Sequence, residues 1–380
     1  MRGRYGAPLT LALVAAALQT ATACEGARTP DPDPVRPAWT AVELPEGFRP
    51  ALLAATDDGS VVVASNGAGD GRPGPRLVEL RDGGVTPVPV RPASYYGRRA
   101  VWTAIATDGR RLYAVGRRSG GAHGIPRWTA WAGTLGSSAG LTEEVQPFTT
   151  FGGAQAGGLS GVVAPVDGPA LLVGSWVTAA GTGLDVALWE HHGRRWMRRA
   201  PTDVALAATD RQQPAAHGIV RRGAGLLVVG AVTAFRPEVR TGPAIWTSPG
   251  AAGPWTEVAL PGAAELVGEA QSASCAADGG CVVGGQEGGH LAVWTVSPAG
   301  AVADASVPDI DVPEGAAVVV AGDGSLLVTG AHPRLLLRRG DSWTEAELPA
   351  GPATGLSVSE STLWVLGGAG DDLGLWRAPA

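Results

Sequence analysis

The sequence has no lysine, so its 29 basic residues are all arginine, and none of them gather in a block long enough to follow a phosphate backbone. The formal net charge is −6, which does not favour nucleic acid as a partner. The sequence therefore predicts no nucleic-acid partner. Abundant alanine and glycine, with arginine in place of lysine, are typical of a GC-rich bacterial genome.

Long stretches of helix-forming residues are also missing. The 57 Gly and 30 Pro residues divide a chain that is 45% hydrophobic into short apolar pieces. Short apolar segments between turn residues are typical of a protein with many β-strands. The composition therefore predicts an all-β fold, and no complete catalytic motif accompanies it.

The N-terminus holds an apolar run of its own. Basic residues in Met1–Tyr5 precede the apolar stretch Ala7–Leu18, and small residues lead to Cys24. About a dozen apolar residues are too few to span a bilayer stably. The pattern resembles the signal peptide of a bacterial lipoprotein, which implies that Cys24 is lipidated. We expect export and anchoring to the outer side of the bacterial cytoplasmic membrane; the alternative is an ordinary secretory signal cut near Ala23.

A polar, proline-rich segment follows this signal. It cannot bury much apolar area, so it is expected to behave as a semi-extended spacer. The sequence thus predicts a signal peptide over residues 1–23, a lipidated cysteine with its linker over 24–38, and a folded domain over 39–380. No later segment has the length of a membrane span.

Apolar strands that end in small residues recur seven times. They are VVVAS from Val61, LYAVG from Leu112, LLVGS from Leu171, LLVVG from Leu226, CVVGG from Cys281, LLVTG from Leu326 and LWVLG from Leu363. An Asp-Gly pair, which favours a tight hairpin, precedes five of them and indicates a strand before each. A strand usually carrying Trp follows, and then a fourth such as WTEVALP from Trp255. Four strands about every 49 residues are typical of a β-propeller blade.

The two ends of this repeat array complement each other. The last repeat stops after three strands, whereas WTAVELP from Trp39 matches the fourth-strand sequences and precedes the first repeat. Pairing of that strand into the last blade closes the ring without an open sheet edge. We therefore predict a seven-bladed β-propeller of four-stranded blades, with six or eight blades as alternatives because the loops blur the count.

Cys275 and Cys281 flank the predicted turn between the first two strands of the fifth repeat. Outside the cytoplasm, cysteines that face each other across a hairpin can form a disulfide. We expect a structural disulfide between them, with a redox-labile bond as the alternative.

The long loops are predicted to share one end of the strands, where loops on a rigid scaffold commonly bind ligands. Residues 91–99 combine aromatic rings with guanidinium groups, which suits sugars or carboxylates. Candidate ligand-binding residues there are Tyr95, Tyr96, Arg98 and Arg99. Polar residues expected near the central channel are Gln155, Arg211, Gln212, Gln213, His217, Glu269 and Gln271. The alternative is structural: Tyr and Arg cap the junction between blades, and Gln side chains satisfy loop backbone groups.

The six histidines do not have the spacing of a metal site. His191 and His192 are expected on a turn, and the other four come from different blades. A zinc site needs several ligands at one point, so each histidine is interpreted as a lone surface residue. We predict no metal and no cofactor.

The first repeat resembles the opening blade of bacterial sialidases and related Asp-box propellers. The likeness rests on Phe48-Arg49-Pro50, on the apolar strand from Val61 and on Asp70-Gly71-Arg72. It implies that Arg49 and Arg72 bind a carboxylate and that Asp70 acts as an acid.

The chemistry of that family is only partly matched. Ser248 and Trp255 keep the spacing of the Asp-box, but Gly250 and Ala252 replace its Asp and Gly. These sialidases use a tyrosine late in the chain as nucleophile, whereas the last tyrosine here is Tyr113.

Two functions therefore stay open. The first is a lipid-anchored, monomeric and non-catalytic module that binds a glycan, a peptide or an envelope protein. The second is a divergent sialidase-like glycoside hydrolase, in which Asp70 with Glu269 or Glu238 supplies acid and base. Because propellers host many unrelated functions, we favour the first.

Overall fold

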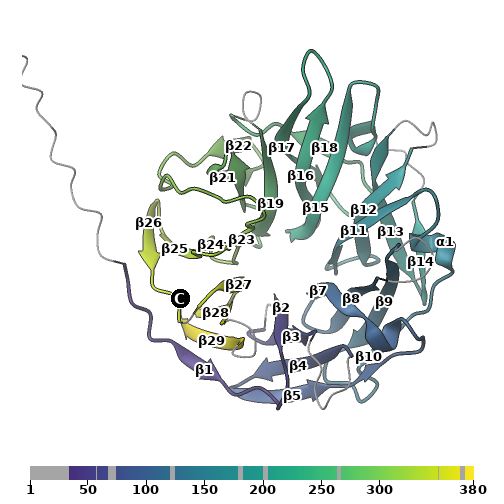
Figure 1. The fold of residues 1–380 in the computed structure, drawn as a ribbon, viewed down its shortest axis with the longest axis vertical. Coiled ribbons are helices and arrows are strands. Elements are labelled where there is room, and N and C mark those ends of the chain that lie inside the picture. Colours follow the sequence, from purple (N-terminus) through teal and green to yellow (C-terminus); the bar gives the residue numbers. More distant parts are fainter. Residues whose placement is uncertain are drawn as a thin grey trace, which may run out of the picture. The chain divides into compact units, whose positions relative to one another are not determined.

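The strands of the computed structural model form seven antiparallel sheets that follow one another around a ring (Figure 1). The structure describes residues 34–56, 58–66, 74–119, 125–178, 183–199, 204–262, 267–349, 351–368 and 373–380. The predicted all-β, seven-bladed propeller is confirmed, and a fifth strand is added to the second blade. Within these ranges, no helix is long and apolar enough to cross a membrane.

Each blade is a meander whose first strand lies innermost. Blade 1 holds β2 (Pro50–Ala55), β3 (Val61–Ser65), β4 (Arg76–Arg81) and β5 (Gly84–Val88). Blade 2 holds β7 (Val101–Thr107), β8 (Arg111–Arg118), β9 (Arg127–Thr134) and β10 (Leu141–Glu143), with β6 (Val90–Arg91) parallel to β10 at the outer edge. Blade 3 holds β11 (Ala156–Val163), β12 (Leu171–Val177), β13 (Leu184–His192) and β14 (Arg195–Arg198).

The remaining blades repeat this order. Blade 4 holds β15 (Gln212–Arg222), β16 (Gly225–Ala234), β17 (Arg240–Ser248) and β18 (Thr256–Val258). Blade 5 holds β19 (Gly268–Cys275), β20 (Cys281–Glu287), β21 (His290–Ser297) and β22 (Gly300–Ala303). Blade 6 holds β23 (Val318–Val320), β24 (Leu326–Val328), β25 (Arg334–Arg339) and β26 (Ser342–Ala346). Blade 7 holds β27 (Ala353–Ser359), β28 (Thr362–Gly367), β29 (Gly374–Pro379) and β1 (Thr40–Val42).

Buried side chains gather between the blades. In the described ranges they form seven clusters, each shared by two neighbouring blades. The third strands of blades 2 to 5 each supply one fully buried tryptophan, namely Trp131, Trp189, Trp246 and Trp294. Apolar burial between blades therefore holds the ring together.

In blades 2 to 5, the second strands continue past the small residues that were expected to end them, and a close backbone approach explains why those residues are small. A Cβ on Gly174, Gly230 or Gly285 would collide with an inner-strand carbonyl oxygen. Six of the seven inner strands carry a β-bulge at this level, whose extra residues are Ala51, Thr103, Ser160, His217, Gln271 and Thr354. A bulge re-aims a side chain, so these residues mark one level around the central channel.

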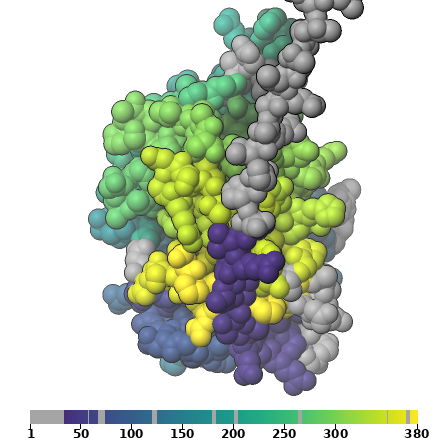
Figure 2. Space-filling view, turned by 90° about the vertical axis from the view of Figure 1, so that its left-hand side faces the viewer, coloured from purple at the N-terminus to yellow at the C-terminus, as the bar shows by residue number. Residues whose placement is uncertain are grey.

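The N-terminal strand closes the ring as predicted. Residues Thr40–Val42 pair antiparallel with β29, with Ala41 opposite Trp376. Upstream, Val35 exchanges two 2.8 Å backbone hydrogen bonds with Glu345 and Glu347 of blade 6. The chain from Val35 to Val42 therefore forms a strap along the outer edges of blades 6 and 7, and Figure 2 shows it in purple across the yellow C-terminal blades.

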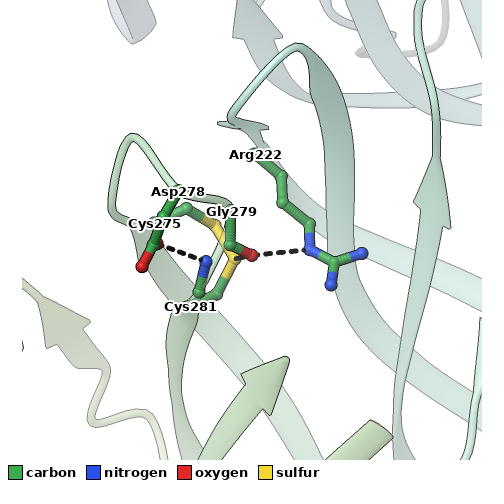
Figure 3. The surroundings of a disulfide bond; sticks show 6 residues. Arg222, Cys275, Asp278, Gly279 and Cys281 are labelled. Atoms are coloured by element: carbon green, nitrogen blue, oxygen red, sulfur yellow. Dashed lines mark hydrogen bonds between the residues drawn. A yellow bond between two sulfur atoms is a disulfide. The ribbon is translucent and has the colours of Figure 1, made fainter. Parts of the chain in front are cut away.

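A disulfide joins the first two strands of blade 5 (Figure 3). Cys275 and Cys281 lie directly opposite each other, with an S–S distance of 2.09 Å. In the turn between them, the carboxylate of Asp278 accepts a 2.8 Å hydrogen bond from the Gly280 amide. Arg222 of blade 4 donates to the carbonyl oxygen of Gly279 at 2.9 Å, so this hairpin is also tied to its neighbour.

Candidate functional site

The connections between strands divide into two sets. Within the blades, tight turns join the first strand to the second and the third strand to the fourth. We call the end of the blades where these turns lie the turn end. The longer connections, from second to third strands and from one blade to the next, lie at the loop end. The structure describes twelve large hydrophobic side chains as exposed, and nine of them lie at the loop end. We call these nine the apolar belt: Tyr95, Val101, Ile125, Val145, Phe148, Val204, Phe235, Val239 and Val267.

Near the central channel, three of the predicted residues come together at the loop end of blades 4 and 5. His217 lies 3.5 Å from the Glu269 carboxylate through Nε2, and its Nδ1 lies 3.2 Å from the Ala270 carbonyl oxygen. Gln271 donates to Glu269 at 2.7 Å, and Gln286 does so at 3.4 Å. The carboxylate of Glu269 is therefore engaged by its neighbours.

Gln271 also ties blade 5 to blade 6. Its Oε1 accepts a 2.5 Å hydrogen bond from the Val318 amide, and Ser272 beside it donates to the Val318 carbonyl oxygen at 2.6 Å. Gln213 similarly accepts from the Leu184 amide of blade 3 at 3.2 Å. These contacts favour the structural alternative for both glutamines, because they satisfy backbone groups of a neighbouring blade.

Other predicted channel residues do not join this cluster. Gln155 and Arg211 are exposed, and each uses its backbone carbonyl oxygen to accept a hydrogen bond across its own blade. Gln212 donates its backbone amide to Thr209 at 3.1 Å. No side-chain hydrogen bond joins Gln155, Arg211 or Gln212 to another described residue.

A second group of predicted residues lies at the rim of the ring. Tyr96 lines a pocket of about 370 Å³ between blades 2 and 3, which we call the rim pocket. Its other lining residues are Ser94, Pro126, Arg127, Trp128, Thr129, Glu143, Glu144, Val145, Gln146, Pro147, Phe148, Phe151 and Gly152. A cavity of this size with aromatic walls and a few polar groups is typical of a small-ligand site.

Arg127 is the cation of this pocket. Its guanidinium carbon lies 4.0 Å from the centre of the Phe148 ring and 5.9 Å from that of Tyr96. Beside the pocket, Arg99 lies 4.2 Å over the exposed ring of Tyr95, whereas Arg98 points to no described partner. The predicted pairing of aromatic and guanidinium groups is thus present, and its central arginine is one that the sequence pattern did not single out.

The wall that carries Tyr96 is held by a buried carboxylate. Glu143 accepts hydrogen bonds from the amides of Ala93 at 2.6 Å and Ser94 at 2.7 Å, and from the Ser94 hydroxyl at 2.5 Å. A Cβ at Gly97 would collide with this carboxylate, so glycine is required there. The loop before η1 (Gly97–Arg99) is therefore fixed in place.

The opposite wall is the single helical turn α1 (Phe148–Phe151). Trp189 donates to the Thr150 carbonyl oxygen at 2.8 Å, and Gln146 donates to the Arg194 carbonyl oxygen at 2.9 Å. The Phe148 ring folds back against Gly152, where a Cβ would collide with it. Both walls of the rim pocket are thus anchored to blades 2 and 3.

The expectation that every histidine is a lone surface residue is wrong for His217, which joins the channel cluster, and more clearly for His191. Its Nε2 lies 2.8 Å from the Glu144 carboxylate, and only 13% of its side chain is exposed. Its ring also packs at 4.9 Å from Trp196 and 5.3 Å from Tyr113, whose pKa is raised by burial. The correction arises because Glu144 is far along the chain and only the packing of blades 2 and 3 brings it to His191.

The central channel has a further cavity at its turn end, which the sequence pattern did not predict. It measures about 450 Å³ and is lined by the last residues of all seven inner strands, mainly Ala, Val, Leu and Ile. Repeated aliphatic positions of the inner strands therefore converge on one axis, although each alone is an ordinary strand residue.

Of the residues suggested for catalysis, the described ones, Arg49, Glu238 and Glu269, lie in blades 1, 4 and 5. Asp70 and Arg72 lie outside the described residues, as does Cys24. The amide of Arg49 donates to the Ser65 hydroxyl at 2.9 Å at the loop end of blade 1. Glu238 is exposed on the connection between β16 and β17 and pairs with Arg240 at 2.9 Å, whereas Glu269 is held in the channel cluster.

No known protein family matches the sequence, and no curated protein sequence matches it either. The structure is similar to a puromycin-hydrolysing peptidase of Mycobacterium tuberculosis, with a TM-score of 0.51, 18% identity, and coverage of 91% of this chain but 55% of the peptidase. It is also similar to the β-propeller domain of the Trilobed protease of Pyrococcus furiosus, with a TM-score of 0.51 and 10% identity, covering 89% of this chain and 96% of that domain.

A sialidase is also among the structural neighbours. The Trypanosoma rangeli sialidase is similar with a TM-score of 0.44 and 10% identity, over 91% of this chain and 59% of the sialidase. The likenesses to the peptidase and to the protease domain, at 18% and 10% identity, show a shared propeller fold alone.

Proposed function

We propose that the protein is an exported, lipid-anchored binding module that engages an envelope protein through the loop end of its propeller and catalyses no reaction there. The apolar belt is the observation that carries this proposal. Nine of the twelve exposed large hydrophobic side chains in the described ranges lie there. A concentration of exposed apolar side chains at one end of a scaffold favours a protein interaction site there.

The state of the channel residues supports binding over catalysis. A general acid or base needs a carboxylate that can reach the substrate, whereas Glu269 is engaged by His217, Gln271 and Gln286.

A turnover screen of residues 34–380 against fluorogenic glycosides, sialosides included, tests whether the protein is catalytic. We expect no turnover above heat-inactivated protein; turnover would support the glycoside hydrolase instead.

Sedimentation with isolated cell envelopes tests the surface. In the purified propeller, the paired substitution Val204→Asp and Val239→Asp places charge on two belt residues that are 82% and 72% exposed. The control pair, Val166→Asp and Val302→Asp, changes residues of 60% and 66% exposure that lie outside the belt. We expect the belt pair to lose most co-sedimentation and the control pair to keep it. Equal loss in both would contradict the proposal.

The anchor is tested separately by Cys24→Ser in the full chain. We expect this variant to leave the membrane fraction and appear in the soluble envelope or medium, because a lipid is then no longer attached. Unchanged membrane association would contradict lipidation at Cys24. It would leave the proposal about the apolar belt unaffected.

A further inference from the structure

Arg127 differs from the arginines at the same place in other blades. The third strand begins with arginine in blades 1, 2, 4 and 6, at Arg76, Arg127, Arg240 and Arg334. Arg334 pairs with Glu345 through two hydrogen bonds, Arg240 pairs with Glu238, and Arg76 donates to the Glu46 carbonyl oxygen at 3.1 Å. No hydrogen bond or ion pair joins the Arg127 guanidinium to another described residue, and it lies over the rings of Phe148 and Tyr96.

An arginine stacked on aromatic rings keeps its N–H donors available for an anion. Stacking fixes the plane of the guanidinium, and that plane matches the two oxygens of a carboxylate. Because Phe148 and Tyr96 hold Arg127 on walls that are themselves anchored, this cation is oriented before any ligand arrives.

Two carboxylates also line the pocket, and both already have protein partners. Glu143 accepts three hydrogen bonds from Ala93 and Ser94, and Glu144 faces His191 at 2.8 Å. Both acids are thus directed to protein donors, and Arg127 is left as the cation of the pocket.

Arginine also outnumbers the acidic residues in the two blades that form the rim pocket. Residues 90–199, which hold blades 2 and 3, contain twelve Arg and six Asp or Glu. Residues 241–333 contain no Arg and ten Asp or Glu, although the whole chain has a net charge of −6. The first sector forms blades 2 and 3, and the second runs from β17 of blade 4 into blade 6 (Figure 1), so arginine is concentrated in the part of the ring that holds the rim pocket, which favours an anionic ligand there.

The walls favour a ring-shaped ligand. Four aromatic side chains line the pocket, namely Tyr96, Trp128, Phe148 and Phe151. Flat aromatic faces pack well against the C–H face of a sugar ring, whereas the acidic side chain of a peptide has no such face. A volume of about 370 Å³ suits a short sugar segment.

We propose that the rim pocket binds an acidic sugar of an anionic glycan, with its carboxylate on Arg127 and its ring against the aromatic walls. This site goes beyond the proposed function, because an envelope protein on the apolar belt does not require a sugar in the pocket.

Calorimetric titration of the purified propeller with trigalacturonate and with a hyaluronan tetrasaccharide tests the proposal. The fully methyl-esterified trigalacturonate is the matched neutral ligand. We expect saturable binding of at least one acidic sugar, at least tenfold weaker binding of the ester, and weakening with added salt. Equal affinity for acid and ester, or no binding of either acidic sugar, would overturn it.

Variants locate the site. Arg127→Gln is expected to weaken binding at least tenfold, and Phe148→Ala to weaken it as well, while both keep the parent melting temperature. The matched control is Arg240→Gln, which changes an arginine at the same strand position outside the pocket and should bind normally. An unchanged affinity of Arg127→Gln for the sugar would contradict the assignment. Displacement of the sugar by a hexaglutamate peptide, added at the same concentration of carboxylate groups, would contradict it as well. The Val204→Asp and Val239→Asp pair should bind sugar normally, which separates this proposal from that of the belt.

Discussion

The carboxylate of Asp58 braces the turn between β2 and β3. It accepts hydrogen bonds from the hydroxyls of Thr56 and Ser60 and pairs with Arg81 at 2.7 Å. The hydrogen bond from Thr56 is the main reason that the pKa of Asp58 is lowered from 3.8 to about 2. The same Asp-Gly pair in blade 3 is Asp167-Gly168, where the carboxylate makes no hydrogen bond to a described residue.

This difference predicts a pH dependence of stability. Because the pKa of Asp58 is lower in the folded state, its contribution is complete above pH 3.8 and is lost as the pH falls toward about 2. Asp58→Asn should therefore lower the free energy of unfolding at pH 7, as measured by urea unfolding. At pH 2 the free energies of unfolding of the variant and the parent should be closer to each other. Asp167→Asn makes the same substitution where the carboxylate has no hydrogen bond to a described residue, so it should cost less stability at pH 7. A stability difference between Asp58→Asn and the parent that stays constant with pH would contradict the assignment.

At the scale of the strand, glycines within the second strands set the approach of β12, β16 and β20 to the inner strands. Each of Gly174→Ala, Gly230→Ala and Gly285→Ala should destabilise the protein by about 1–3 kcal/mol, because the added methyl group meets a backbone oxygen. Gly250→Ala is the control, since nothing lies within 4 Å of a Cβ there. Thermal unfolding distinguishes the two cases; equal effects at Gly174 and Gly250 would contradict the close approach.

The elements were predictable because their signals are local. An Asp-Gly pair selects a tight turn, and an apolar run that ends in glycine carries its own mark. The rim pocket was only partly predictable. Tyr96 stands in a segment rich in Tyr and Arg, but Arg127 begins β9 and Phe148 begins α1, so only the folded chain brings the three side chains together. The His191–Glu144 pair was missed for the same reason, since it joins residues of different blades.

At the scale of the whole molecule, the strap from Val35 to Val42 joins the ends of the ring. Removing residues 34–38 deletes two backbone hydrogen bonds to blade 6 and should lower the melting temperature by a few degrees. Removing residues 34–44 also deletes β1, which uncovers the edge of β29 and should cause aggregation on size-exclusion chromatography. A monomer with the parent melting temperature after the longer deletion would contradict closure by β1.

Ring closure was predictable because a fourth-strand sequence stood before the first repeat. The uneven distribution of charged and exposed apolar side chains around the ring was not predictable, because it depends on where blades that are far apart in sequence lie in the folded protein.

The central claim is that the loop end, and not the turn end, meets a partner in the cell. Photo-cross-linking in living cells tests it most directly, with the photoreactive residue placed at Val239 in the apolar belt or at Val166 at the turn end. We predict a discrete protein adduct from Val239 and none from Val166. Adducts from Val166 alone, or equally from both positions, would contradict the claim.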